Sequence, residues 1–130
     1  MGWNWIECSG LTDWREMFEL EEYEDFVDSK ANYVVKDASD YGRLVYPTLG
    51  FVGEAGEFAN KVKKLDRDGD GSYSAEQQAA LIDELSDCLW YMTRLSHVLG
   101  CNLVDIAKAN MVKLQSRAER GTLAGSGDHR

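Results

Sequence analysis

The stretch from Ser74 to Gly100 constrains the fold most strongly, because it has the marks of one long amphipathic helix. Ser74 and Gln77 form the S-x-x-Q pattern of a capping box, which signals a helix start, and Gly100 is a natural stop. Between them, apolar side chains recur at steps of three and four, which predicts a stripe that faces a core. The stripe consists of Leu81, Leu85, Cys88, Met92, Leu95 and Leu99.

Helical patterns extend over nearly the whole chain. Further helices are predicted over about 12–35, 47–65 and 102–121, and the first of them can break near its middle. Thr12 can cap the first helix, Pro47 is tolerated in the first turn of the second, and Asn102 begins the last. We therefore expect an all-α bundle with short connections.

Length and composition fit a single domain. The chain has 130 residues, 44% of them hydrophobic, with one proline and no long linker. We expect one domain over residues 1–130, with an N-terminal helical region (1–43), the motif-bearing helices (44–121) and a mobile tail (122–130). Three glycines inside a predicted helix indicate either close helix packing or room for a ligand; they are Gly50, Gly53 and Gly56.

Charge and patterning exclude several classes of partner. The net charge of −9 argues against a nucleic acid polymer, whereas it is compatible with carboxylates gathered around metal ions. No apolar run is long enough to cross a membrane, and the N-terminus lacks the pattern of a signal peptide. Three scattered cysteines fit a reduced, cytoplasmic protein, which would be the host cytoplasm if a phage encodes it.

A calcium loop is one hypothesis for residues 66–77, DRDGDGSYSAEQ. Aspartates occupy its first, third and fifth positions and a glycine its sixth, as in an EF-hand. The twelfth position, however, is Gln77 where the pattern requires a bidentate glutamate. Because Ser74 and Gln77 also fit the capping box of the next helix, we interpret the loop primarily as a turn-rich connection between two helices.

Two pairs of carboxylates on consecutive predicted helices are the strongest chemical signal. Glu54 and Glu57 form one pair, Glu84 and Asp87 the other, and each pair has the i, i+3 spacing that places both side chains on one helix face. Such pairs are also common on solvated surfaces. Both pairs here border apolar residues, and inward carboxylates would repel one another unless a divalent cation lay between them. The pattern indicates a magnesium or manganese site.

Cationic and polar residues follow on the same helices. Lys61 and Lys64 lie four and seven positions after Glu57, and Tyr91 lies four after Asp87. On the last helix, Asn110, Lys113 and Arg117 share one face, which is either a solvated surface or a phosphate-binding face. Carboxylate-bound metals together with Lys and Arg are suited to phosphoryl chemistry.

Three segments together resemble the MazG-like family of all-α nucleoside triphosphate pyrophosphohydrolases, in particular its short, phage-type members. The segments are GEAGEFANKVKK (53–64), DELSDCLWYM (83–92) and ANMVKLQSR (109–117). They match the family's E-x-x-E, E-x-x-D and N-x-x-K motifs on successive helices. The resemblance implies a four-helix core assembled as a homodimer or homotetramer.

The resemblance also implies the reaction and the site. It implies cleavage between the α- and β-phosphates of a nucleoside triphosphate with Mg²⁺, for which Mn²⁺ can substitute. Metal ligands would be Glu54, Glu57, Glu84 and Asp87, with Glu57 or Glu54 orienting or deprotonating the attacking water. Phosphate or sugar contacts would come from Asn110 and Lys113 and, with a weaker match, from Lys61, Lys64, Tyr91 and Arg117. The tail can close over bound phosphates.

The motifs do not specify the base. Aromatic residues before them, such as Tyr23, Phe26, Tyr33 and Tyr46, offer stacking surfaces. The carboxylates of Glu24, Asp25 and Asp28 can accept hydrogen bonds from guanine, which favours a purine such as dGTP. Two other hypotheses stay open at this stage: a calcium-binding helical module, and a helical scaffold without catalysis.

Overall fold

The computed structural model describes residues 19–33 and 38–122. Within them lie four α-helices and no strand: α1 (Leu20–Lys30), α2 (Asp40–Asp68), α3 (Ala75–Val98) and α4 (Leu103–Glu119). The all-α prediction is therefore confirmed. The predicted cap Thr12 and most of the tail fall outside the described residues.

Helix α2 begins earlier than the sequence indicated. Its start is fixed by Ser39, whose hydroxyl oxygen accepts a hydrogen bond from the Gly42 backbone N–H at 3.0 Å. Pro47 consequently lies inside the helix, and the prediction that it occupies the first turn was wrong. A proline in a helix interior removes one backbone hydrogen bond, but the Pro47 ring is fully buried, so its packing offsets part of that loss.

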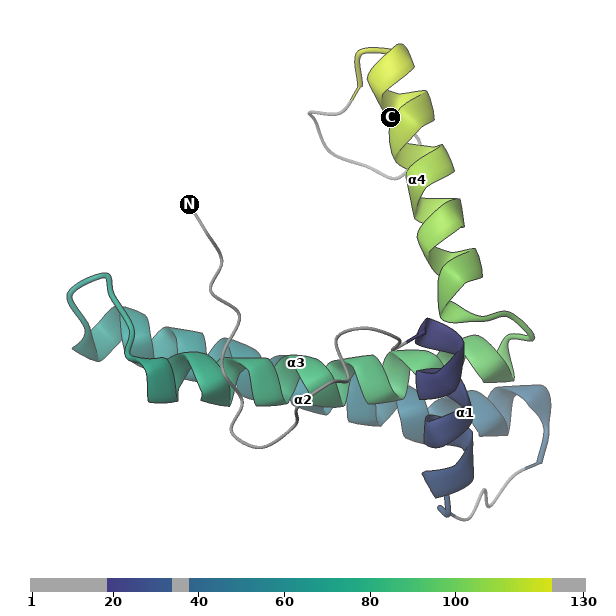
Figure 1. Ribbon diagram of the computed structural model, residues 1–130, viewed down its shortest axis with the longest axis horizontal. Helices are drawn as coiled ribbons and strands as arrows, with labels where there is room; N and C mark the ends of the chain where they lie inside the picture. Colours follow the sequence, from purple (N-terminus) through teal and green to yellow (C-terminus); the bar gives the residue numbers. More distant parts are fainter. Residues whose placement is uncertain (1–18, 34–37, 123–130) are drawn as a thin grey trace.

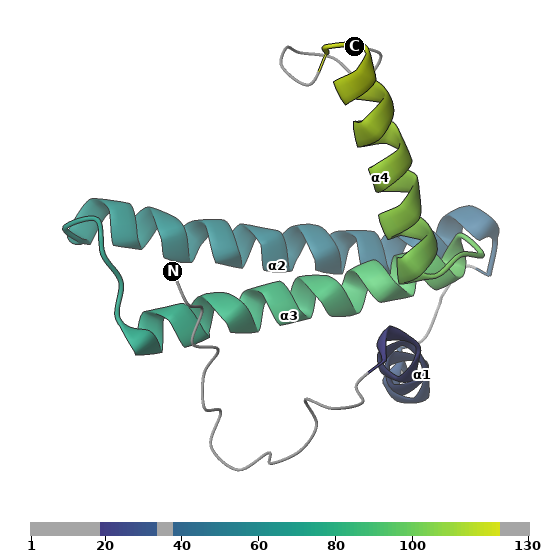
Figure 2. The same cartoon turned by 45° about the horizontal axis from the view of Figure 1, so that its top comes forward.

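Helices α2 and α3 form a long antiparallel hairpin, which makes up most of the described part of the chain (Figures 1 and 2). Their close approach depends on Gly50, because a methyl group at that position would overlap the Tyr91 ring of α3. For Gly50, the close-packing interpretation is thus correct. Gly53 and Gly56 differ, because an added methyl group at either would meet no atom within 4 Å beyond the neighbouring backbone of α2 itself.

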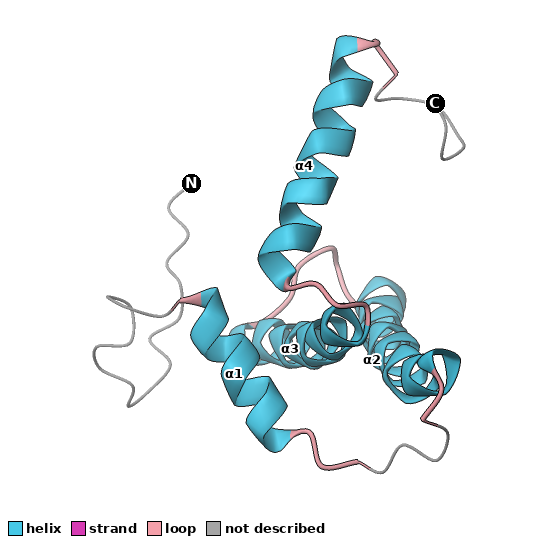
Figure 3. Ribbon diagram, turned by 90° about the vertical axis from the view of Figure 1, so that its right-hand side faces the viewer, coloured by secondary structure: helices cyan, strands magenta, loops and turns pink. Residues whose placement is uncertain are grey.

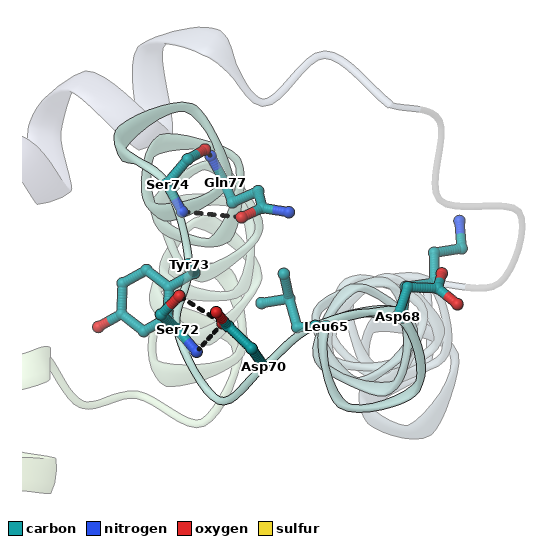
Figure 4. A pocket seen from close by; sticks show the side chains of 9 residues that line it. Leu65, Asp68, Asp70, Ser72, Tyr73, Ser74 and Gln77 are labelled. Atoms are coloured by element: carbon teal, nitrogen blue, oxygen red, sulfur yellow. Dashed lines mark hydrogen bonds between the residues drawn. The ribbon is translucent and has the colours of Figure 1, made fainter.

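The hairpin turns through Gly69–Ser74, beside a cavity of about 710 Å³ (Figure 4). Asp70 accepts hydrogen bonds from the backbone N–H (3.1 Å) and the hydroxyl (2.6 Å) of Ser72, and Gly71 takes a left-handed φ of 91°. The predicted capping box then starts α3: Gln77 N–H donates to the Ser74 hydroxyl, and Ser74 N–H donates to the Gln77 side chain.

The other end of the hairpin holds the most deeply buried residues, where α1, α3 and the start of α4 meet. Val27 of α1, Thr93 and Ser96 of α3, and Leu103 of α4 are all buried there. Buried Glu24 of α1 accepts a hydrogen bond of 2.7 Å from the Leu103 N–H, at the positive end of the α4 dipole.

The connection from α3 to α4 is short and tightly bonded. Gly100, with a φ of 73°, donates to the His97 carbonyl, and Cys101 donates to the Ser96 carbonyl, which together form a Schellman motif. Asn102 and Asp105 then form a reciprocal capping box at the start of α4. The stop at Gly100 and the start at Asn102 were both predicted correctly.

Helix α4 projects from this junction away from the hairpin instead of lying along it (Figures 1 and 3). Among the described helices it contacts α1 and α3 but not α2. Large apolar side chains of α4 are consequently uncovered: Met111 is 69% exposed and Leu114 44% exposed. None of the four helices has both the length and the apolar character needed to cross a membrane.

Candidate metal centre between helices α2 and α3

Three of the four predicted carboxylates meet between the hairpin helices. Glu54 of α2 and Glu84 and Asp87 of α3 each offer an oxygen, and these oxygens lie within 4.8 Å of one another. Glu54 and Glu84 are half-buried, whereas Asp87 is exposed, so the group is open to solvent on one side. We call these three residues the carboxylate cluster.

The electrostatics of the carboxylate cluster fit a bound cation. Burial, followed by the negative charges of Asp87 and Glu84, raises the pKa of Glu54. The charged form is therefore disfavoured in the metal-free protein, and a divalent cation would relieve the repulsion. Oxygen-only ligands of this type suit Mg²⁺ or Mn²⁺ better than the softer metals.

Glu57 lies outside the carboxylate cluster. It is exposed on α2, one helical turn beyond Glu54, and its charge makes only the smallest contribution to the raised pKa of Glu54. Lys61, by contrast, lies at the cluster, with its Nζ 3.2 Å from a Glu84 oxygen. Lys64 is exposed and lines the cavity beside the 69–74 turn instead.

The negative charge of the carboxylate cluster contributes to raised pKa values of several neighbouring side chains. Burial and then the Tyr46 hydroxyl raise the pKa of Tyr91, with smaller contributions from Glu54 and Asp87. Burial and then Asp87 raise the pKa of Tyr23, which belongs to α1. Burial and the three carboxylates also raise the pKa of the Cys88 thiol, which favours its neutral form. That Tyr23 and Cys88 lie near the cluster was not predicted, because Tyr23 is on a separate helix and Cys88 was assigned to the core stripe.

The predicted phosphate-binding residues of α4 do not meet the carboxylate cluster within one chain. Asp87 lies 11 residues before the end of α3 at Val98, which is about 16 Å along the helix. Lys113 lies ten residues after the start of α4, about 15 Å along a helix that leads away from the hairpin (Figure 3). Asn110 and Lys113 are exposed and Arg117 is half-buried.

A second group of interacting polar side chains, between α1 and α3, was not predicted from the sequence. Arg94 of α3 pairs with Asp28 of α1 and donates to the Tyr33 hydroxyl at 3.2 Å, while His97 Nδ1 lies 2.9 Å from the same Asp28 oxygen. These residues line a cavity of about 350 Å³ where α1, α2 and α3 meet, together with Arg43 and Val98. Position 94 follows Asp87 by seven, so the heptad spacing along α3 could have revealed Arg94.

An aromatic path joins this cavity to the carboxylate cluster. The rings of Tyr33 and Tyr46 are stacked with centroids 4.4 Å apart, and Tyr46 lies 6.3 Å from Tyr91 at a tilted angle. Tyr91 is four residues from Asp87 on α3 and packs on Gly50. The three tyrosines therefore connect the cavity, which Tyr33 lines, to the neighbourhood of the carboxylate cluster.

The 66–77 segment does not form a calcium loop in this structure. Asp66 and Asp68 belong to the last turn of α2, and in Figure 4 the Asp68 carboxylate points away from Asp70. Asp70 is occupied by its hydrogen bonds to Ser72. Among the described residues, the acidic group able to share one ion is the carboxylate cluster, and it includes nothing from this segment.

Comparison with known proteins identifies the family. The model of the MazG nucleotide pyrophosphohydrolase domain matches residues 48–122, which include the carboxylate cluster and α4. The chain belongs to this family. The MazG domain begins within α2, so α1 lies outside the matched region. The chain is also 47% identical to the Gene 37 protein of Mycobacterium phage L5 over 94 residues, which cover 72% of this chain and 82% of that protein. No solved structure matches the chain.

Family membership confirms the resemblance drawn from the three motif segments. Membership of this family implies the general activity that the family's description states, which is nucleotide pyrophosphohydrolysis. Within the MazG domain, the three gathered carboxylates come from the E-x-x-E and E-x-x-D motifs of successive helices, so separate motifs of the sequence meet in one place in the fold.

Proposed function

We propose that this chain is a Mg²⁺-dependent nucleoside triphosphate pyrophosphohydrolase that releases a nucleoside monophosphate and pyrophosphate. The observation that carries this proposal is the meeting of Glu54, Glu84 and Asp87 within 4.8 Å in a chain of the MazG family. Mn²⁺ is expected to replace Mg²⁺, because the same hard oxygen ligands serve both ions.

In this proposal the carboxylate cluster holds the metal, with Glu57 as a further ligand or as a base. When bound, Mg²⁺ would polarise phosphate oxygens and offset the charge that develops on them. Lys61, already beside Glu84, would add positive charge at the same place. The remaining predicted contacts to phosphate or sugar are assigned to Tyr91, Lys64, Asn110, Lys113 and Arg117.

The proposed reaction is hydrolysis of one phosphoanhydride bond. The oxygen of a water molecule forms a bond to the α-phosphorus. The bond from this phosphorus to the oxygen that bridges the α- and β-phosphates breaks, and pyrophosphate leaves with the bonding electrons. A proton of the water passes to a carboxylate, for which Glu57 is suited, because it is exposed next to the carboxylate cluster and outside it. Glu54, whose raised pKa favours proton uptake, is the alternative.

We assign the base of the nucleotide to the cavity of about 350 Å³ where α1, α2 and α3 meet. Support comes from the stacked rings of Tyr33 and Tyr46 and from the Arg94 guanidinium 5.7 Å from the centre of the Tyr33 ring. Of the carboxylates first considered for guanine, Glu24 is buried and bonded to Leu103. Of the remaining two, Asp25 and Asp28, it is Asp28 that lines this cavity, so we assign Asp28 as the acceptor. A purine such as dGTP remains the proposed preference.

We also propose that residues 1–130 form one domain, because α1 packs on α3 although it lies outside the matched MazG region.

The test of the proposed function is incubation with each NTP and dNTP in the presence of Mg²⁺, followed by separation of the products. Monophosphate with pyrophosphate is the expected outcome. Orthophosphate, or no turnover of any nucleotide, would exclude it. A scaffold without catalysis predicts in addition that Mg²⁺ and nucleotide leave the melting temperature unchanged.

A further inference from the structure

We propose that Arg94 and Asp28 together select guanine over the other bases. Arg94 donates hydrogen bonds to O6 and N7 of the base, and Asp28 accepts hydrogen bonds from its N1–H and N2–H groups. This inference rests on the proposed function, because it concerns the substrate of that site, and it adds the two side chains that distinguish one base from another. It is carried by the donors and acceptors that remain unused in the cavity of about 350 Å³.

Asp28 keeps one carboxylate oxygen without a hydrogen-bond partner. Arg94 Nη1 and His97 Nδ1 both lie against its Oδ1, and no described residue donates to its Oδ2. An ionised carboxylate has about four acceptor sites, so about two are left on Oδ2. The Asp28 side chain is 52% exposed and lines the cavity, so a ligand can reach this oxygen. Asp28 therefore offers free acceptor sites to a ligand that carries N–H groups.

Arg94 is held by one part of its guanidinium and leaves another part free. Its Nε donates to the Tyr33 hydroxyl at 3.2 Å and its Nη1 to Asp28, whereas Nη2 makes no hydrogen bond with a described residue. The two bonds restrict the orientation of the planar guanidinium, which has donors only. Arg43 of α2 lines the same cavity and forms no ion pair with a described residue. The unused groups of the cavity are thus the donors of two arginines beside the acceptor oxygen of Asp28.

Guanine is the base whose edges match these groups. Its O6 and N7 are adjacent acceptors, and arginine bound to both is the commonest specific contact between a side chain and a base. Its N1–H and N2–H groups form a donor edge that suits a carboxylate, which only accepts. Adenine would place its N6–H donors against the guanidinium and its N1 acceptor against the carboxylate. Cytosine has the same mismatch, and thymine and uracil lack both N7 and the second donor.

The position of Arg94 also fits a nucleotide whose phosphates lie at the carboxylate cluster. Arg94 follows Asp87 by seven residues, which is nearly two helical turns, so both lie on the same face of α3 about 10.5 Å apart along its axis. Tyr91 lies between them on this helix and is near Tyr46, which stacks on Tyr33 of the cavity. A base bound at Arg94 would therefore direct its sugar and phosphates along α3 toward Asp87.

The test compares kcat/KM for dGTP with kcat/KM for three analogues that lack parts of the recognised edges. In dITP the N2 amino group is missing, in 7-deaza-dGTP N7 is missing, and in dATP both O6 and N1–H are missing. Wild-type protein should prefer dGTP by about 10-fold over dITP and over 7-deaza-dGTP, and by about 100-fold over dATP, in line with the contribution of one good contact to a base edge. Equal kcat/KM for dATP and dGTP would overturn the inference and leave the proposed function standing.

Two variants assign the contacts to their side chains. Asp28→Ala should reduce the preference for dGTP over dITP to about 2-fold or less. Arg94→Lys keeps the positive charge but loses the planar fork, so it should reduce the preference for dGTP over 7-deaza-dGTP in the same way. Each preference is measured on one preparation, so the fraction of folded protein cancels. Glu22→Gln removes an exposed charge of α1 outside the cavity and should retain both preferences. Preferences that persist in both cavity variants would contradict the inference.

If wild-type protein hydrolyses no nucleotide, the proposed function fails, and binding still tests the choice of base. Titration calorimetry with the same four nucleotides and Mg²⁺ should then give the lowest Kd for dGTP, and Asp28→Ala should bind dGTP and dITP about equally. Equal affinity of the wild-type chain for dGTP and dATP, or no binding of any of the four, would overturn the inference.

Discussion

Glu54→Gln is expected to stabilise the metal-free protein while it abolishes stabilisation by Mg²⁺. In the metal-free state the Glu54 carboxylate lies within 4.8 Å of Glu84 and Asp87. At that distance two unit charges repel by about 1 kcal/mol in water and by about 3.5 kcal/mol at an effective dielectric constant of about 20. Because Asp87 is exposed and Lys61 partly neutralises Glu84, values at the lower end apply.

We therefore expect Glu54→Gln to raise the free energy of unfolding by about 1–2 kcal/mol, which corresponds to roughly 3–8 °C in melting temperature. Wild-type protein should gain about 2.7 kcal/mol when Mg²⁺ is present at 100 times its Kd, and the variant should gain almost nothing. The assay is thermal unfolding by circular dichroism with EDTA or with Mg²⁺.

Asp83→Asn is the matched control for this experiment, because it removes one negative charge from an exposed position of α3 outside the carboxylate cluster. It should change the melting temperature little in either condition. A Glu54→Gln variant that melts below the wild type in EDTA would refute the reasoning, since Glu54 would then make a favourable contact instead of being repelled.

Further predictions concern pH, packing and the base of α4. The pKa of Glu54 in the folded state lies above its ordinary value of 4.5. The contribution of the protonated Glu54 carboxyl to folding stability is therefore complete below pH 4.5 and is lost as the pH rises through the raised pKa. Because Mg²⁺ binds the ionised carboxylate, stabilisation by Mg²⁺ should be larger at about pH 7.5 than at about pH 5, and thermal melts at both pH values would show this. Gly50→Ala should cost about 1–3 kcal/mol in urea unfolding, because the added methyl group overlaps Tyr91, whereas Gly56→Ala, which meets nothing within 4 Å, should not destabilise the chain. Glu24→Ala should lower the free energy of unfolding by about 1–3 kcal/mol by leaving the buried Leu103 N–H without its acceptor, and Glu24→Gln, which keeps an acceptor, should cost less.

Local signals in the sequence predicted the helix ends that local hydrogen bonds determine. The capping boxes at Ser74 and Asn102 and the stop at Gly100 are all present, because each depends on residues within five positions of one another. The start of α2 was missed because Pro47 is an equally local signal for a first turn. Its acceptance inside the helix depends on burial by distant residues, which no local pattern reveals.

The carboxylate cluster was predictable to the extent that it follows from helix periodicity. Two i, i+3 pairs on consecutive antiparallel helices brought Glu54, Glu84 and Asp87 together, as the sequence indicated. The exposed position of Glu57 could not be predicted from the sequence, because it depends on the rotation of α2 about its own axis relative to α3. The direction of α4 was equally hidden, since it is set by the buried bond between Glu24 and Leu103, 79 positions apart in sequence.

The measurement that tests the central claim most directly is the identification of products from a nucleoside triphosphate incubated with the protein and Mg²⁺. Wild-type chain should release monophosphate and pyrophosphate in equal amounts, and EDTA should stop the reaction. Glu57→Gln and Asp87→Asn should abolish turnover while the helical circular dichroism spectrum is retained. Release of orthophosphate, turnover that persists in EDTA, or full activity of Asp87→Asn would contradict the account.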